Sequence, residues 1–200
     1  AAKRPVFVLG GGLATDGVKT AVGRMLERFQ AAVFTTYAGR GLVAPDYPLS
    51  FGATLARADS EDVLRSSDCV VVIGSDLSEV DLWRTEPGIV GGAGIHINID
   101  PEVLARAHVE DTRVICDAVD FLFFSNITTG DTPSSTWDSQ EVRDYNKRMR
   151  AQINAERPGI LPVADALKEA LPEDTMIFSD MTQFAYATKE VYPMDRPGHW

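Results

Sequence analysis

The strongest constraint on the fold is a set of short apolar segments that have the length of a strand and carry β-branched residues on both faces. Residues 69–74 read CVVVIG, and residues 6–9 form a similar run just before three consecutive glycines. A strand that is apolar on both faces is typical of a parallel sheet, because helices cover both sides of such a sheet. These segments therefore predict a layered α/β domain.

Further strand and helix patterns alternate along the first 125 residues. We expect strands at residues 32–35, 94–99 and 113–116, and helices at about residues 15–29, 60–68 and 117–124. Thr15 is the expected N-cap of the first of these helices. Residues 35–52 are rich in Gly and Pro and are expected to form a loop. The alternation predicts a doubly wound, Rossmann-like parallel sheet of five strands.

The pattern changes after residue 125. Residues 125–139, SNITTGDTPSSTWDS, are poor in apolar side chains and predict an interdomain linker or, alternatively, a long surface loop. A charged helix at about residues 139–156 follows, then an amphipathic helix at 161–171, a strand at 175–180 and a helix at 181–192. One strand with two helices cannot close a core alone. We therefore divide the chain into a central domain (residues 1–125), a linker with the charged helix (126–157) and the beginning of an incomplete second α/β unit (158–200).

Charge and cysteine content exclude several classes of partner. The chain has 29 acidic and 19 basic residues, for a net charge of −10. Because phosphate binding needs clustered Lys and Arg, nucleic acid and anionic membranes are disfavoured as partners. The sequence contains no apolar stretch of membrane-spanning length and no signal-peptide pattern. Cys69 and Cys116 lie far apart without metal-ligand spacing, which favours free thiols in a reducing cytoplasm over a disulfide.

Three glycines, Gly10, Gly11 and Gly12, stand where the first strand gives way to a helix. A dinucleotide fingerprint needs G-x-G-x-x-G and an acidic residue about 20 positions further on. Here the third glycine is absent and the second strand ends in Thr35 and Thr36, so ordinary NAD binding is not expected. One alternative is a tight turn. The other is a helix N-terminus that receives an anion or nucleotide in another pose, as in a stand-alone FAD-, NAD- or ADP-binding module.

Four segments read together resemble a known family. They are RPVFVLGGG, AAVFTTYAGRGLVAPDYPLSFG, SDCVVVIGSDLSEVD and GIHINIDPEVLAR. In order and spacing, residues 4–124 resemble the central domain of thiamine diphosphate enzymes, the group of acetolactate synthase, benzoylformate decarboxylase and related 2-oxo-acid decarboxylases. Residues 171–200, LPEDTMIFSDMTQFAYATKEVYPMDRPGHW, resemble the beginning of the diphosphate-binding domain of that family.

The resemblance implies that the chain is a piece of a longer enzyme. A pyrimidine-binding domain with the catalytic glutamate would precede Ala1, and a Gly-Asp-Gly to Asn segment that holds Mg²⁺ and the diphosphate would follow Trp200. It also implies thiamine diphosphate and Mg²⁺ as cofactors, a small 2-oxo acid as substrate, and a homodimer or homotetramer. These 200 residues alone are expected to be scaffold, with no catalytic residue or metal ligand of their own.

The same resemblance indicates a diphosphate contact near the end of the chain. Acetolactate synthases carry Val-Gly-Gln-His at this place, and here Met181, Thr182, Gln183 and Phe184 take those positions. Gln183 keeps an amide donor, whereas Phe184 loses the donor of the histidine. No Lys or Arg is expected at the spot, so Mg²⁺ and the following segment would supply the compensating charge. The alternative is a plain helix N-cap at Thr182.

Some acetolactate synthases bind FAD in the central domain, and the chain departs from their pattern. Those proteins place Asp-Arg after the third strand and Asp-Ile-Asp at the end of the fourth. The matching residues here are Glu79-Val80 and Asn98-Ile99-Asp100, so FAD is not expected. The positions that would still face a nucleotide are Gly10, Gly11, Gly12, Thr36 and Gly39.

Three other residues are given structural interpretations. His96 lies inside a strand pattern and is expected to be a half-buried imidazole, not a general base. Trp83 and Trp137 flank loops, where they are candidate anchors of an interface. The carboxylates of SDLSEVD, residues 75–81, are expected to form a solvated connection.

Overall fold

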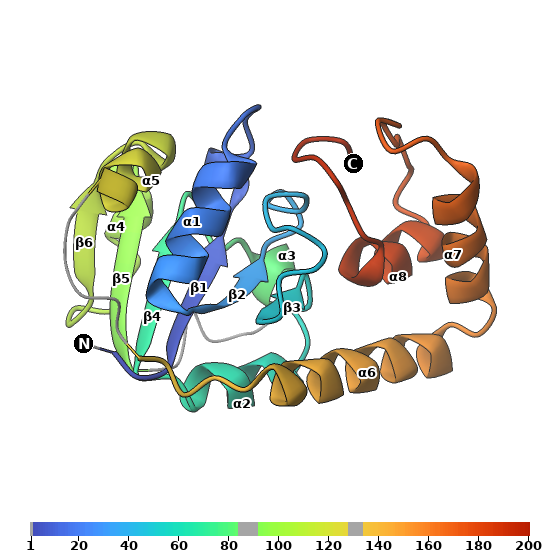
Figure 1. The fold of residues 1–200 in the computed structure, drawn as a ribbon, viewed down its shortest axis with the longest axis horizontal. Helices are drawn as coiled ribbons and strands as arrows, with labels where there is room; N and C mark the ends of the chain where they lie inside the picture. Colours follow the sequence, from blue (N-terminus) through green and yellow to red (C-terminus); the bar gives the residue numbers. More distant parts are fainter. Residues whose placement is uncertain (1, 84–91, 128–133) are drawn as a thin grey trace.

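The structure of this chain is a computed structural model that describes residues 2–83, 92–127 and 134–200. Within them, six parallel strands form one sheet in the order β3-β2-β1-β4-β5-β6 (Figure 1). The strands are β1 (Pro5–Leu9), β2 (Ala32–Thr35), β3 (Ser50–Gly52), β4 (Cys69–Ile73), β5 (Ala93–Asn98) and β6 (Thr112–Ile115). The doubly wound parallel sheet expected from the sequence is confirmed.

Helices lie on both faces of this sheet and beyond its β3 edge. In chain order they are α1 (Lys19–Phe29), α2 (Asp59–Arg65), α3 (Glu79–Leu82), α4 (Pro101–Leu104), α5 (Ala118–Ile127), α6 (Ser139–Glu156), α7 (Ile160–Ala170) and α8 (Gln183–Val191). A short 3₁₀ turn, η1 (Gly11–Leu13), follows β1. Figure 1 shows α6 running from below the β2 and β3 side of the sheet to the pair α7 and α8.

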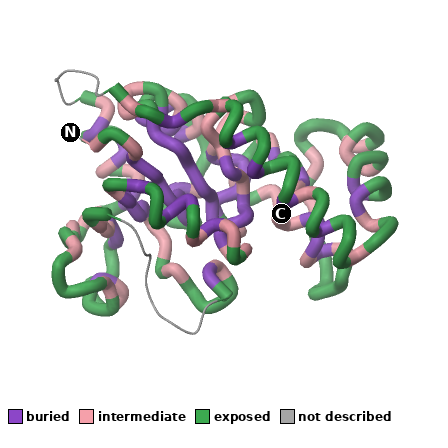
Figure 2. The backbone as a smooth tube through the Cα atoms, turned by 90° about the horizontal axis from the view of Figure 1, so that it is seen from below, coloured by how far each residue is buried: buried purple, intermediate pink, exposed green. Residues whose placement is uncertain are grey.

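The alternation of side chains in β1 explains the two layers of the core. Phe7 and Leu9 point into a cluster built with α1 and α5, whereas Val6 and Val8 point into a second cluster built with α2 and α6. Because successive side chains of a strand point to opposite faces, a central strand needs apolar residues at every position. Figure 2 shows that the buried residues are concentrated in the sheet. Most residues of α7 are exposed, whereas most of those of α8 are buried or half-buried.

Two local expectations within the central region were wrong. Residues 50–52, expected to be loop, form the short edge strand β3, which pairs with β2 through Val33 and Phe34. The first long helix begins at Lys19, and Val18, not Thr15, occupies its N-cap position without a side-chain hydrogen bond. The turn η1 and Gly17, whose φ is +82°, intervene between β1 and the helix and delay its start.

The strand expected at residues 175–180 does not form. In this segment the N–H of Ile177 donates to the carbonyl of His199 at 2.8 Å. A strand is stabilised by the ladder it makes with a neighbouring strand, and no described strand lies beside this segment. The apolar pattern of residues 175–180 was therefore insufficient to make a strand here.

The charged helix α6 has the expected bounds and is part of the core of the sheet. Asp138 caps it by accepting a hydrogen bond from the N–H of Gln140 at 2.9 Å. Trp137, just ahead of it, is 8% exposed and donates its indole N–H to the carbonyl of Pro5 at 2.8 Å. Trp137 thus anchors α6 within the chain, and the hypothesis that it faces a partner was wrong.

The segment between α5 and α6 includes residues 128–133 of the expected linker, which lie outside the described residues. Beyond α6, the helices α7 and α8 pack through small clusters, such as that of Ile153, Leu161 and Ala187. Among the described residues, no helix combines the length and apolarity needed to cross a membrane.

Candidate functional site

The first candidate site is a crevice at the carboxyl ends of β1, β4 and β5, which we call the carboxyl-edge crevice. It has a volume of about 370 Å³. It lies at the switch point of the sheet, where β1 has β2 as its neighbour on one side and β4 on the other. Ligands of doubly wound sheets bind at this position. The residues that line it are Gly11, Gly12, Thr36, Ala38, Gly74, Ser75, Asp76, Ser78, Asp81, Asn98, Ile99, Asp117 and Ala118.

The crevice brings together three of the five residues proposed to face a nucleotide, namely Gly11, Gly12 and Thr36. Gly10 and Gly39 are buried by backbone instead. A Cβ on Gly10 would lie 2.3 Å from the carbonyl oxygen of Gly74, and a Cβ on Gly39 would lie 2.2 Å from that of Leu9. These two glycines are required by close packing of the chain.

Most backbone N–H groups of the glycine turn already donate hydrogen bonds to carbonyl groups of the protein. The N–H groups of Gly10 and Gly12 donate to the carbonyls of Ile73 and Gly74, at 2.9 and 2.8 Å. Those of Leu13 and Ala14 donate back to the turn. A phosphate-binding loop needs free N–H groups that point at the anion. The turn therefore resembles a structural strand-to-helix connection more than a phosphate cradle.

The charges of the carboxyl-edge crevice also oppose an anionic ligand. Asp76, Asp81 and Asp117 line it, and none of its described lining residues is Lys or Arg. Asn98 donates its side-chain amide to the carbonyl of Ser75 at 3.2 Å and to the carboxylate of Asp76 at 3.1 Å. Asp117 accepts hydrogen bonds from the first turn of α5. A diphosphate in this crevice would meet like charge at short range.

The second candidate site is the N-terminus of α8, which we call the α8 lip (Met181–Phe184). The Thr182 hydroxyl caps the helix by accepting from the N–H of Ala185 at 3.3 Å. The first-turn N–H groups of Gln183 and Phe184 have no intrahelical partner and suit an anion. Met181 is 65% exposed, and Thr182 and Gln183 are exposed beside it.

Two features of the α8 lip differ from what the sequence indicated. Phe184 is only half-exposed and packs on the cluster of Tyr192 and Met194, so it supports the helix from behind. A cation is present, because the Nζ of Lys189 lies 3.9 Å from the sulfur of Met181. Residues 181–184 themselves contain no Lys or Arg, as the sequence indicated, but Lys189, near the other end of α8, contacts the Met181 side chain through its ammonium group.

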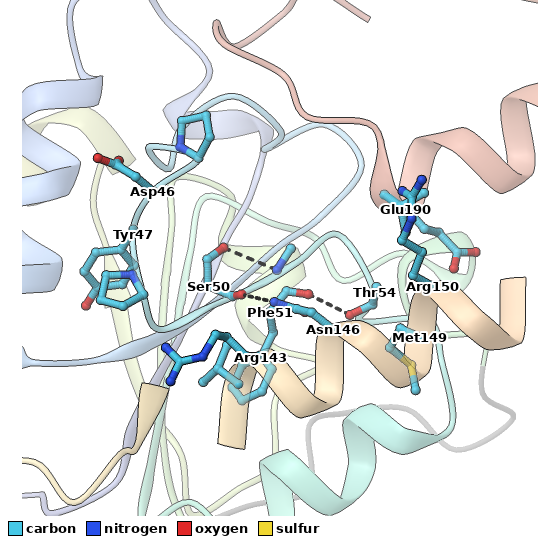
Figure 3. Close-up of a pocket in the computed structure, with 15 residues that line it drawn as sticks. Asp46, Tyr47, Ser50, Phe51, Thr54, Arg143, Asn146, Met149, Arg150 and Glu190 are labelled. Atoms are coloured by element: carbon cyan, nitrogen blue, oxygen red, sulfur yellow. Dashed lines mark hydrogen bonds between the residues drawn. The ribbon is translucent and has the colours of Figure 1, made fainter. Parts of the chain in front are cut away.

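A further cavity, of about 500 Å³, lies between α6 and the loops on either side of β3 (Figure 3). Several of its polar groups have hydrogen-bond or ion-pair partners within the protein. Asn146 donates to the carbonyl of Ser50 at 2.8 Å, Arg143 donates to Gln140, and Arg150 pairs with Asp165. The cavity is therefore a seam between the sheet and the C-terminal helices, with no acid–base pair among its described residues.

Nothing in the described part of the chain assembles a metal site, since it holds no cluster of three or more His, Cys, Asp or Glu residues in suitable positions. Cys69 and Cys116 are half-buried free thiols, as expected. Burial, with a smaller contribution from Asp68, raises the pKa of Cys69 and so keeps its thiol protonated. The α8 lip is thus the arrangement best suited to a cofactor, and Mg²⁺ would need ligands from elsewhere.

Comparison with known proteins identifies relatives over the whole chain. Residues 1–123 match the family model described as thiamine pyrophosphate enzyme, central domain. A protein of Pseudomonas aeruginosa named probable 2-ketoarginine decarboxylase AruI is 30% identical over 100% of this chain and 35% of its own length. The acetolactate synthase isozyme 1 large subunit of Escherichia coli is 24% identical over 100% of this chain and 36% of its own length.

A solved structure shows the same fold. The benzoylformate decarboxylase of Polynucleobacter necessarius superposes with a TM-score of 0.68 at 19% identity, covering 98% of this chain and 36% of that one. The chain spans about a third of the length of the curated relatives it matches.

Proposed function

The chain belongs to the thiamine pyrophosphate enzymes, and from that membership we propose that the full-length protein is a thiamine diphosphate-dependent enzyme that acts on a 2-oxo acid. The observation that carries the proposal is that residues 1–123 match the family model and that the similarity to a decarboxylase extends over the whole chain, the α8 lip included. The alternative function, that of a stand-alone nucleotide-binding module, is disfavoured by the acidic lining of the carboxyl-edge crevice.

The residues of the α8 lip fit a diphosphate group. The cofactor, when bound, supplies the nucleophilic carbon and the electron acceptor for the chemistry. On this proposal the first-turn N–H groups and the side-chain amide of Gln183 hold diphosphate oxygens, while Lys189 adds positive charge nearby. Thr182 keeps the first turn of the helix in place. The sheet behind acts as scaffold, so these 200 residues alone are expected to have no activity.

Further properties of the full-length protein follow from family membership as proposals. We place its Mg²⁺ ligands in the remainder of the diphosphate-binding domain and its catalytic glutamate in a pyrimidine-binding domain of the same protein, and we propose a homodimer or homotetramer. A cytoplasmic location is supported by the two free thiols, and the net charge of −10 argues against nucleic acid and anionic membrane surfaces as partners.

We place decarboxylation ahead of carboligation as the reaction. The relative at 30% identity carries the name of a decarboxylase, whereas the synthase is 24% identical over the same share of this chain. A 2-oxo acid with a basic side chain, such as 2-ketoarginine, is accordingly the first substrate to test, with pyruvate as the alternative.

The test is a CO₂-release assay of the full-length protein with thiamine diphosphate, Mg²⁺ and a panel of 2-ketoarginine, pyruvate and benzoylformate. We expect cofactor-dependent release from at least one substrate, and product analysis then separates decarboxylation from carboligation. Calorimetry should show thiamine diphosphate binding that Gln183→Ala weakens about three- to tenfold, the value of one or two hydrogen bonds. Tight binding of FAD, NAD or ADP with no thiamine diphosphate binding would favour the nucleotide-binding module instead.

A further inference from the structure

A buried ion cluster joins the central region to the helix that carries the α8 lip. Arg57, two residues before α2, donates its Nε to one carboxylate oxygen of Glu190 at 2.5 Å and an Nη to the other at 3.1 Å. Its second Nη donates to Glu156, at the end of α6, at 2.5 Å. The guanidinium of Arg57 therefore binds two carboxylates that lie 99 and 133 positions further along the chain.

The pair of Arg57 and Glu190 is shielded from water. Their side chains are 14% and 9% exposed, whereas that of Glu156 is 47% exposed. Burial, with a smaller contribution from the charge of Glu156, raises the pKa of Glu190, and the hydrogen bond and charge of Arg57 oppose that effect. Burial works against the charge of Arg57 too, but the two carboxylates outweigh it and the pKa of Arg57 rises. A buried fork of this kind fixes both the distance and the angle between its partners.

Glu190 lies near the end of α8, and the α8 lip lies at the beginning of the same helix. With nine residues and a rise of about 1.5 Å per residue, the two ends are roughly 12 Å apart along a rigid rod. The fully buried residues of α8 are small (Ala185, Ala187 and Thr188), and the larger Phe184 and Val191 pack against neighbouring clusters while only partly buried. These apolar contacts are non-directional, so the ion pair adds the directional contact that sets where the lip lies.

Other contacts hold the chain that follows α8, among them the ion pair of Lys168 with Asp195 and two hydrogen bonds from the central domain to backbone atoms. Lys19 donates to the carbonyl of Asp195 at 2.7 Å, and Arg40 donates to that of Trp200 at 2.9 Å. Figure 1 shows this C-terminal segment returning toward the β2 and β3 side of the sheet. These contacts hold the segment after α8, whereas the guanidinium of Arg57 binds a side chain of α8 itself, that of Glu190.

We propose that Arg57 is a positioning residue for thiamine diphosphate: through Glu190 it sets the orientation in which α8 presents Thr182 and Gln183 to the diphosphate. The inference rests on the proposed function of the α8 lip. It assigns to the central domain a specific part in cofactor affinity, carried by a residue that does not touch the cofactor.

The test compares Arg57→Met with Arg150→Met in the full-length protein. Arg150 is a matched control, because it too pairs with a carboxylate, that of Asp165 on α7, but both side chains are about half exposed (42% and 54%). We expect the Kd of thiamine diphosphate at saturating Mg²⁺ to rise about tenfold in Arg57→Met and less than about twofold in Arg150→Met. At saturating cofactor, kcat should stay within about twofold of wild type in both variants. A raised Kd with an unchanged kcat is not what general loss of structure would give.

A double variant, Arg57→Met with Glu190→Leu, separates positioning from folding. Arg57→Met alone leaves a buried carboxylate without a partner, whereas apolar replacement of both members of a buried pair is often tolerated. We expect the double variant to melt near the wild-type temperature yet still bind thiamine diphosphate about tenfold more weakly. Wild-type affinity in the double variant would overturn the inference while leaving the proposed function intact. A wild-type protein that does not bind thiamine diphosphate would refute the proposed function and the inference with it.

Discussion

At the scale of single residues, the glycines of this chain differ in what they contribute. Gly11 and Gly12 are exposed at the rim of the carboxyl-edge crevice. Gly39 is buried against the end of β1. The absence of a side chain at Gly39 is therefore a packing requirement, and it explains a glycine that the sequence alone associates equally well with a ligand.

Replacing Gly39 with alanine should destabilise the fold. The new Cβ would lie 2.2 Å from the carbonyl oxygen of Leu9, a backbone atom that cannot move without distorting the sheet. We expect the free energy of unfolding to fall by about 2–3 kcal/mol, measured by urea denaturation. Gly23→Ala is the control: Gly23 lies within α1, and a Cβ there would meet no neighbouring segment within 4 Å, so that change should stabilise by about 0.5–1 kcal/mol. Equal effects of the two substitutions would contradict the packing argument.

His96 should make stability depend on pH. Its Nε2 lies 3.0 Å from a carboxylate oxygen of Asp111, and burial lowers the pKa of His96 although Asp111 partly opposes this. The folded state therefore binds a proton less readily than the unfolded chain does. The contribution of His96 to stability is fully present above about pH 6.5. It is lost as the pH falls from there toward the lower pKa that His96 has in the folded state.

Replacing His96 with glutamine should make the midpoint of urea unfolding less sensitive to pH between about pH 7 and pH 5. The exposed Val109, which carries no titratable group, offers a control, because Val109→Ala should leave the wild-type dependence unchanged. A His96→Gln variant that loses as much stability on acidification as the wild type would show that other groups are responsible.

At the scale of elements, α6 is the helix whose role changes most between sequence and structure. It reads as a charged connector, yet Val142, Tyr145 and Met149 pack its inner face onto the sheet. Tyr145 stacks edge-on against Phe34 and Phe51, and burial raises the pKa of its hydroxyl to about 12. The charged residues of α6 occupy the opposite face, as expected for an amphipathic helix.

Substitutions on the two faces of α6 should differ sharply. Met149 is 0% exposed, so Met149→Ala should cost about 2–5 kcal/mol of stability. Tyr145→Phe removes the hydrogen bond between its hydroxyl and that of Thr54 (3.1 Å) and should cost about 1 kcal/mol. Lys147→Ala, on the exposed face, should change stability by less than about 0.5 kcal/mol. Similar losses for Met149→Ala and Lys147→Ala in denaturant titrations would show that α6 does not dock as described.

At the scale of the whole molecule, the chain consists of a well-packed sheet and a C-terminal pair of helices with few buried residues (Figure 2). The seam between them contains the 500 Å³ cavity and the ion cluster of Arg57. The role we propose for the central domain follows from this arrangement. On this proposal the central domain holds the α8 lip in place.

The sequence by itself determined the parallel sheet, because strands such as Cys69–Ile73 are apolar at every position and the helices between them carry apolar stripes. It also pointed to Thr182 and Gln183 as candidates for a cofactor contact. Only the tertiary structure decided that β3 forms, that residues 175–180 do not pair, and that Arg57, Glu190 and Lys189 lie where they do. The physical reason is that periodicity records which side of an element is buried, whereas strand pairing, ion pairs and close backbone contacts depend on segments that are far apart in the chain.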